Sequence, residues 1–184
     1  ERYGPITIEW ATDKTRAFEI FDEMCDLHQA RWQAIGEPGV FASHRFARFN
    51  REWIDAAFPD HVALSRVTAG EVTIGCDYAF AQHNRLLGYQ WGLAQVDDHR
   101  VSVGSVTAAM VMQAALKRGF DEYDHLSGDS LYKRQLSTTA RELVWTSIGI
   151  GARTNAIYRL ADTKRKATQL RASLPQIGDL IATR

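Results

Sequence analysis

The chain has 184 residues, 45% of them hydrophobic, and this length and composition favour one domain with a sizeable core. Its 22 basic and 22 acidic residues cancel, which excludes a uniformly basic protein, so a nucleic-acid partner would need a local basic patch. No run approaches the roughly 20 apolar residues that span a membrane. Cys25 and Cys76 fall in apolar phases of their elements, and we predict two buried thiols, as suits a reducing cytoplasm.

The first part of the chain predicts one strand and two helices. Residues 6–10 have strand character, and Thr12 and Asp13 offer an N-cap for the helix that follows. Apolar residues recur along that helix at steps of three and four until Gly36, and a second helix repeats the pattern until Pro59. The two apolar faces consist of Phe18, Phe21, Cys25, His28 and Trp32, and of Phe46, Phe49, Trp53 and Ala56.

Three strands are predicted next, over residues 61–67, 72–80 and 86–93. The middle strand alternates most clearly between apolar and small or polar residues, with a period of two. Turn-like pairs, Ala69-Gly70 and His83-Asn84, separate the three strands. We therefore expect an antiparallel meander.

The remaining elements alternate between helix and strand. An Ala-rich helix over residues 105–118 is apolar on nearly every side, so we expect it to be buried against the sheet until Gly119 ends it. A strand over residues 122–126, a helix that carries Tyr132, a strand over residues 143–150 and a last helix follow. The order predicts an α/β (α+β) fold, with helices flanking a mixed, mostly antiparallel sheet. The apolar stripe of the last helix consists of Ala156, Leu160, Thr163, Ala167, Leu170 and Leu174.

The stretch from Tyr123 to Lys133 resembles the motif Asp-Phe-Leu-Arg-Gly-Asp-Glu-x-Tyr-Lys of the CelD-like (cellulose-biosynthesis-associated) acyltransferases. These belong with the Fem-type peptidyltransferases in the GNAT N-acyltransferase superfamily. His125, Ser127 and Ser130 replace the motif's aromatic residue, arginine and glutamate. The run from Leu27 to Trp32 and the loop at 102–104 also resemble the family, so the likeness covers about residues 18–136 in collinear order. The motif positions that match are Asp124, Leu126, Gly128, Asp129, Tyr132 and Lys133.

The resemblance implies a function as well as a fold. It implies one GNAT-type acyltransferase domain over residues 1–184, which we expect to be the C-terminal half of a longer, two-half bacterial protein that works in the cytoplasm. The activity would move an acyl group from acyl-CoA (acetyl-CoA) to a small-molecule, saccharide or peptide amine by direct attack, without a covalent enzyme intermediate. The domain would pair with a second GNAT-like half or form a homodimer.

The resemblance implies that the pyrophosphate of the donor binds on the loop before the Ala-rich helix, where the helix N-terminus favours an anion. The resemblance implies that the backbone of residues 86–93 holds the thioester. An ordinary loop with Ser105 as N-cap is the alternative. Lys133 could bind phosphate, pair with Asp124 or be a solvated charge. The predicted donor-binding residues are Arg100, Val101, Val103, Gly104, Ser105 and Lys133.

Two residues are predicted to be catalytic. The resemblance makes Tyr132 the acid that protonates the departing thiolate, as a neutral phenol can do. Asp124 would be the base that deprotonates the incoming amine. The alternatives are that the Tyr132 ring packs on the sheet and that Asp124 braces the following turn. Asp129 is assigned to capping the Tyr132 helix.

The resemblance implies an acceptor site along the first long helix, with His28, Arg31 and Trp32, and we also expect Gln90, on the strand over residues 86–93, to bind the acceptor. A histidine that packs in the core is the alternative for His28. No grouping of His, Cys, Asp and Glu has metal-ligand spacing, and no nucleophile elbow is present, so we expect neither a metal nor a covalent mechanism.

Two other functions remain open. The reduced glycine loop and the basic last helix favour a Fem-type transferase that uses aminoacyl-tRNA, although a solvated basic face explains the helix equally well. The replacement of the motif arginine by Ser127 favours a catalytically inert half that binds a substrate or a partner. The basic residues of the last helix are Arg153, Arg159, Lys164, Arg165, Lys166 and Arg171.

Overall fold

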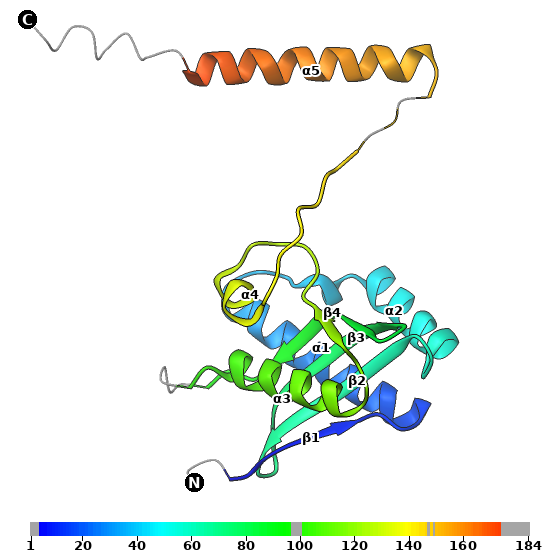
Figure 1. Cartoon of the computed structure of the whole chain (residues 1–184), viewed down its shortest axis with the longest axis vertical. Helices are drawn as coiled ribbons and strands as arrows, with labels where there is room; N and C mark the ends of the chain where they lie inside the picture. The colour runs from blue at the N-terminus through cyan, green and yellow to red at the C-terminus, as the bar shows by residue number, and fades with distance from the viewer. Residues whose placement is uncertain (1–3, 97–100, 147, 149, 174–184) are drawn as a thin grey trace, which may run out of the picture. The chain divides into compact units, whose positions relative to one another are not determined.

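A computed structural model describes residues 4–96, 101–146, 148 and 150–173, and divides the chain into two compact units, Glu1–Ala140 and Arg141–Arg184. The first unit contains a five-stranded sheet in the order β1-β2-β3-β4-β5 (Figure 1). The first four strands pair antiparallel, and the fifth pairs parallel with β4. This confirms the predicted mixed, mostly antiparallel sheet. The strands are β1 (Ile6–Trp10), β2 (Val62–Ala69), β3 (Val72–Gln82), β4 (Arg85–Leu93) and β5 (Glu122–Asp124).

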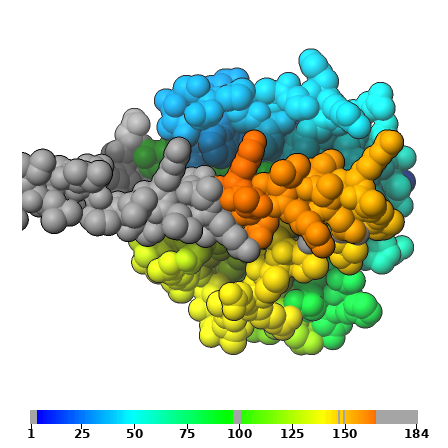
Figure 2. Space-filling model, turned by 90° about the horizontal axis from the view of Figure 1, so that it is seen from above, coloured from blue at the N-terminus to red at the C-terminus, as the bar shows by residue number. Residues whose placement is uncertain are grey.

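Helices cover both faces of the sheet. The helix α1 (Lys14–Ala34), the short 3-10 helix η1 (Val40–Ala42) and α2 (His44–Ala57) lie against one face, and α3 (Val103–Lys117) lies against the other (Figure 1). In the space-filling view α1 and α2, in blue and cyan, lie side by side (Figure 2). The side chain of Asp13 accepts a hydrogen bond from the Arg16 N–H (2.9 Å), so α1 has the predicted N-cap.

The larger core lies between the sheet and the first two helices. Its centre is Tyr78, which is fully buried and meets the rings of Phe21 and Phe80 edge-on at 5.7 and 5.6 Å. Cys76 is buried in the same cluster and Cys25 is half-buried beside it. Both thiols are free, as predicted, and burial raises the pKa of each to about 12.

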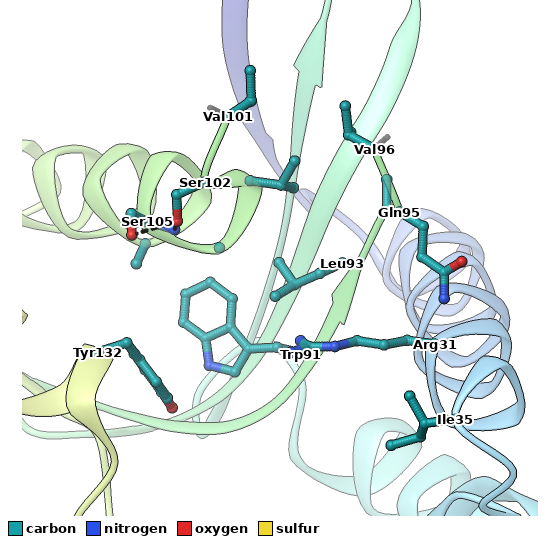
Figure 3. Close-up of a pocket in the computed structure, with 14 residues that line it drawn as sticks. Arg31, Ile35, Trp91, Leu93, Gln95, Val96, Val101, Ser102, Ser105 and Tyr132 are labelled. Atoms are coloured by element: carbon teal, nitrogen blue, oxygen red, sulfur yellow. Dashed lines mark hydrogen bonds between the residues drawn. The ribbon is translucent and has the colours of Figure 1, made fainter. Parts of the chain in front are cut away.

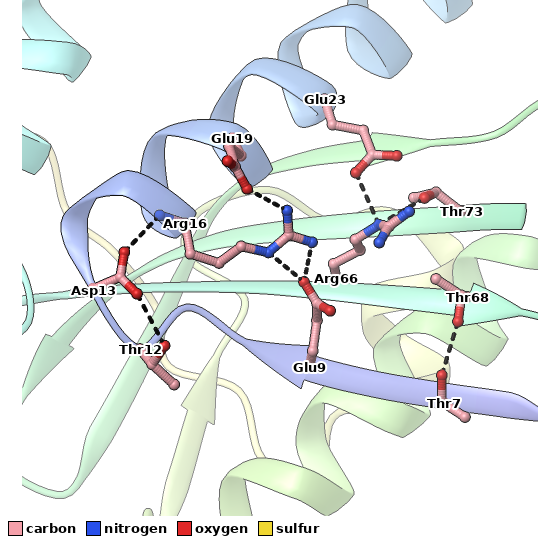
Figure 4. Close-up of polar contacts among 10 residues, drawn as sticks. All are labelled: Thr7, Glu9, Thr12, Asp13, Arg16, Glu19, Glu23, Arg66, Thr68 and Thr73. Carbon is pink, nitrogen blue, oxygen red and sulfur yellow. Dashed lines mark hydrogen bonds and ion pairs between the residues drawn. The ribbon is translucent and has the colours of Figure 1, made fainter. Parts of the chain in front are cut away.

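Polar contacts tie α1 to the β1 edge of the sheet (Figure 4). The Arg16 guanidinium donates to Glu9 on β1 (2.7 Å) and to Glu19 one turn further along α1 (2.6 Å). Arg66 on β2 pairs with Glu23 at 2.9 Å. All these groups are partly solvated, so each pair adds about 1 kcal/mol or less to the free energy of unfolding.

The backbone of α1 touches β4 at Gly92. A Cβ placed there would lie 2.4 Å from the carbonyl oxygen of Met24 and 2.8 Å from its Cα. Backbone atoms cannot rotate away, so Gly92→Ala must push α1 off the sheet. We expect a loss of about 1–3 kcal/mol in the free energy of unfolding, measured by urea denaturation.

The control for this substitution is Val72→Ala, at an exposed strand position, which should change the unfolding free energy by less than about 0.5 kcal/mol. A Gly92→Ala variant with a wild-type midpoint would show that α1 does not pack this closely on β4.

Several predicted boundaries differ from the structure. The strand predicted over residues 143–150 is wrong for its described residues, none of which belongs to a strand. The alternation there is typical of a strand, but a strand also needs a neighbour to pair with. The helix α3 begins at Val103 because Ser102, not Ser105, is its N-cap, and only one of its faces is buried.

In the second unit α5 spans Ala152–Ser173, and no described helix of the chain is long and apolar enough to cross a membrane.

Candidate active site

A pocket of about 580 Å³ opens at the C-terminal end of β4, within the first unit (Figure 3). Four elements contribute to it: the end of α1, the end of β4 with the residues that follow, the first turn of α3, and the short helix α4 (Leu131–Leu136). Since α1 and α3 cover opposite faces of the sheet, the pocket has a wall from each side. It is lined by Arg31, Ile35, Trp91, Leu93, Ala94, Gln95, Val96, Val101, Ser102, Val103, Gly104, Ser105, Ala108 and Tyr132.

The sheet itself opens beside the pocket. β5 pairs with β4 only at Arg85, Leu86 and Leu87, and no described strand pairs with that edge of β4 further along. The register of β3 on β4 also shifts, from Tyr78 opposite Gln90 to Ala79 opposite Gly88. Tyr89 is left without a partner, as in a β-bulge. Backbone N–H and C=O groups on the edge of β4 that faces away from β3 therefore have no described strand partner here and can bind a ligand.

The first turn of α3 forms one end of the pocket. Ser102 Oγ accepts from the Ser105 N–H at 3.4 Å and lies 2.8 Å from Ser105 Oγ. The other N–H groups of a first helical turn have no intrahelical acceptor, and the helix dipole is positive there. This turn can therefore bind an anionic group such as a phosphate.

The phenol of Tyr132 lines the pocket from α4. Burial raises the pKa of Tyr132 above its usual value, and the smaller effects of Ser130 and Arg31 act in the opposite direction. The Tyr132 ring meets the imidazole of His125 edge-on at 6.0 Å. Tyr132 is thus a neutral proton donor at physiological pH, held in place by a ring contact.

The pocket brings together six of the predicted site residues, one from α1, four from the loop and first turn of α3, and one from α4. The predicted donor residue Arg100 lies outside the described residues. Five others are described but do not line the pocket: His28, Trp32, Gln90, Asp124 and Lys133. The six that line it are Arg31, Val101, Val103, Gly104, Ser105 and Tyr132.

The chain between β5 and α4 differs from what the sequence predicts. The strand ends at Asp124 rather than at residue 126, because Asp124 Oδ1 accepts the Leu126 N–H at 2.7 Å and Leu126 has a φ of 57°. Asp124 is half-buried and lies 3.5 Å from Arg85. It therefore braces the turn, which was its alternative interpretation, and its role as a base stays a prediction.

The polar residues around α4 also have partners other than those predicted. Lys133 Nζ donates to the carbonyl oxygens of His125 and Ser127 at 2.7 and 2.6 Å, and so ties down the turn before α4 instead of pairing with Asp124. Asp129 is not the N-cap of α4: Ser130 occupies that position, and Asp129 pairs with Arg134. Tyr132 is accordingly the second residue of α4.

His28 has the contacts of a core histidine. Its Nε2 accepts from the Trp32 indole at 2.9 Å, and its ring meets Phe41 edge-on at 5.1 Å. It is 7% exposed, and burial lowers its pKa, so it is neutral. The helical pattern alone favoured this reading, and the structure gives His28 and Trp32 a bracing role at the end of α1.

Sequence reasoning missed the aromatic wall of the pocket. Trp91 lines the pocket, its ring lies 6.1 Å from that of Tyr123, and the Tyr123 ring lies 5.1 Å from that of His125. The Tyr123 hydroxyl donates to Asp77 Oδ1 at 3.0 Å beneath this wall. In the sequence Asp77 falls in the small or polar phase of its strand, and the available signal was the Ala-rich helix expected to bury that face of the sheet.

One pocket is bordered by a helix N-terminus, a neutral phenol and two strands that separate. This combination is typical of an acyl-transferring enzyme with the N-acyltransferase fold. The sequence model of the protein family Acetyltransferase (GNAT) domain matches residues 1–134, so the chain belongs to the GNAT acetyltransferase family. No curated protein matches the chain in sequence.

Solved structures share the fold. One is the aminoglycoside acetyltransferase meta-AAC0020 from an uncultured soil metagenomic sample in complex with sisomicin: 13% identity, TM-score 0.51, 79% of this chain and 97% of that chain covered. Another is a possible acetyltransferase from Clostridium difficile 630: 8% identity, TM-score 0.51, 79% of this chain and 99% of that chain covered. At such identities the likeness shows the fold alone.

Proposed function

We propose that this domain moves an acyl group from acyl-CoA, with acetyl-CoA as the reference donor, to an amine by direct attack. The observation that carries the proposal is that Tyr132 and the first turn of α3 line one pocket beside the unpaired edge of β4. The motif that ends in Tyr132 and Lys133 supports a place near the CelD-like and Fem-type groups, in a bacterial cytoplasm.

The donor fits the α3 end of the pocket. The hydroxyls of Ser102 and Ser105 and the first N–H groups of α3 would hold the pyrophosphate. The apolar side chains of Leu93 and Val101 also line the pocket, and would pack against the pantetheine arm. Bound acyl-CoA supplies an activated thioester at the far end of that arm.

Residues of the chain would then serve the transfer itself. The unpaired N–H groups of β4, near the bulge at Tyr89, would donate to the thioester oxygen as negative charge develops on it. The phenol of Tyr132 would give its proton to the departing thiolate as the C–S bond breaks, and the attacking nitrogen would lose its proton to solvent, from which the phenolate regains one. Neither thiol of the chain lines the pocket, which is consistent with direct attack.

The test of donor binding is Gly104→Glu, followed by calorimetry with acetyl-CoA and free CoA. The substituted side chain would enter the proposed phosphate site, where its carboxylate repels the donor. We expect the Kd for acetyl-CoA to rise at least about tenfold. The fold should tolerate the change, because an acidic residue is favourable in a first helical turn and the nearest atom to the new Cβ, at 3.3 Å, is the flexible Leu93 Cδ1.

The matched control is Gly104→Gln, which has the same size without the charge and should bind more tightly than the glutamate variant. Wild-type affinity in Gly104→Glu would place the donor elsewhere. No heat from folded wild-type protein would refute acyl-CoA as the donor. Aminoacyl-tRNA would then be titrated, since a salt-sensitive complex with it would favour the Fem-type alternative.

A further inference from the structure

Most of the arginines that the structure describes in the first unit have a partner, and the exceptions are Arg31 and the exposed Arg45 on α2. Six of them form ion pairs with carboxylates, and Arg118 lies over the ring of Trp10 at 5.0 Å. Arg31, in the last turn of α1, forms no ion pair with any residue that the structure describes. The six pairs are Arg16 with Glu9, Arg48 with Glu52, Arg51 with Asp22, Arg66 with Glu23, Arg85 with Glu122, and Arg134 with Asp129.

Arg31 is also the one described residue of the pocket lining that carries a formal charge. Its side chain extends from α1 into the pocket (Figure 3), and its charge is felt by the Tyr132 phenol. No Asp or Glu occurs among the described lining residues. The walls around Arg31 are the apolar Ile35, Trp91 and Leu93, with Gln95 as a neutral polar neighbour.

This lining disfavours a polycationic acceptor. Several ammonium groups would enter a pocket without a described carboxylate to pair with, and they would approach a guanidinium of the same sign. Like charges a few ångströms apart in a partly desolvated site repel each other by about a kilocalorie per mole or more. An acceptor with an oxyanion near its amine would instead meet an unpaired guanidinium, which can bind a carboxylate or a phosphate through two parallel hydrogen bonds.

The arrangement of the pocket separates this charge from the donor site. The phosphate-binding turn of α3 lies on one face of the sheet, and Arg31 comes from α1, which covers the other face. An anionic donor placed at the α3 end therefore leaves Arg31 free for the second substrate.

We infer that the acceptor is an amine that bears a carboxylate or a phosphate, and that Arg31 is the residue that selects it. The inference rests on the proposed acyl transfer and names the substrate class of the same pocket. It differs from the chemistry of sisomicin, the aminoglycoside bound by one of the structures that share the fold.

The test compares two matched pairs of small amines with acetyl-CoA as donor, measured by thiol release: β-alanine against β-alaninamide, and 2-aminoethyl phosphate against 2-methoxyethylamine. Sisomicin serves as the polycation. The inference predicts that the anionic member of at least one pair has a kcat/KM at least about 10-fold higher, and the preferred pair identifies the oxyanion. Arg31→Gln should remove this preference by raising KM for the anionic amines alone.

The control is Arg45→Gln, which removes the same charge from α2, away from the pocket lining, and should keep the preference. Equal transfer to both members of each pair, or better transfer to sisomicin, would overturn the inference. So would an Arg31→Gln variant that loses kcat for all amines alike, because Arg31 would then act on Tyr132 and not on the acceptor.

A failure of the proposed function can be told apart from a failure of this inference. If no amine is acetylated, binding of the same amines to protein saturated with CoA is measured by calorimetry. Binding of an anionic amine that Arg31→Gln abolishes would support the inference although transfer fails. No binding of either anionic amine would overturn it.

Discussion

Replacing Tyr132 with Phe is expected to lower kcat for acyl transfer about 100-fold while the affinity for acetyl-CoA stays close to that of the wild type. The phenol lines the pocket, and the substitution removes its hydroxyl together with the hydrogen bond between that hydroxyl and Ser130. The ring contact with His125 would survive in the variant. The substitution therefore removes the proton that the departing thiolate needs and keeps the ring in place.

The pH dependence of this reaction gives a second signature. Burial raises the pKa of Tyr132, so the phenol keeps its proton at neutral pH and loses it only in alkaline solution. Wild-type kcat should therefore fall on the alkaline side, and this limb should be absent from Tyr132→Phe. Steady-state kinetics from neutral to alkaline pH would measure both.

Tyr158→Phe is the matched control, because Tyr158 on α5 has the same 44% exposure as Tyr132 but does not line the pocket. Its kcat should equal that of the wild type. Turnover at the wild-type rate in Tyr132→Phe would remove this residue from the mechanism, and the proton would have to come from water or from another group.

The second large effect is expected at Asp77, and it concerns stability. Asp77 is 1% exposed, its Oδ1 accepts from the Tyr123 hydroxyl, and its Oδ2 has no partner among the residues that the structure describes. Burial raises the pKa of Asp77 to about 7, and the hydrogen bond from Tyr123 offsets only part of this. The ionised form of Asp77 is therefore costly in the folded state.

The direction of the pH dependence follows from the two pKa values. Below about pH 4 the carboxyl group of Asp77 is protonated in both the folded and the unfolded state, so it adds no pH dependence to the free energy of unfolding. Between about pH 4 and pH 7 only the folded state keeps the proton, so the free energy of unfolding falls as the pH rises. Above pH 7 the free energy of unfolding stays lower by the full amount. At about 1.4 kcal/mol for each unit of pKa difference between the two states, this amount is on the order of 4 kcal/mol.

Asp77→Asn should remove that loss, since the amide has the same shape and stays neutral. In urea denaturation the variant should match the wild type near pH 4 and be more stable by several kcal/mol near pH 8. Asp60→Asn, at an exposed turn, is the control and should show no such pH-dependent gain. A constant difference between Asp77→Asn and wild type over this range would show that Asp77 is ionised in the fold without penalty.

Local sequence patterns predicted most of the first unit. The period of three to four residues in α1 and the period of two in β3 arise from burial of one face, and a single sequence carries that signal. The loop before α3 was predicted from its likeness to the family, while the apolar run placed the start of the helix at Ser105, three residues after the observed N-cap Ser102. The pocket lining at the α3 end could therefore be predicted.

The other half of the pocket depends on contacts between distant parts of the chain. Asp77 and Tyr123 are 46 residues apart, and they meet only because β5 pairs with β4 in one particular register. The pairing of β5 with the first residues of β4 alone, which opens the sheet, has no local signature. The strand predicted over residues 143–150 was wrong for the same reason. Alternation along the sequence indicates a strand, but it does not show whether a neighbouring strand is there to pair with it.

The position of Trp91 has a practical consequence. Its indole lies in the pocket wall beside the Tyr123 ring, and indole fluorescence responds to the polarity and the quenching groups around it. The protein therefore carries an intrinsic optical reporter of pocket occupancy. The difference between the emission of the wild type and of Trp91→Phe isolates this signal from the other tryptophans, so that ligand exchange can be followed in real time without a label.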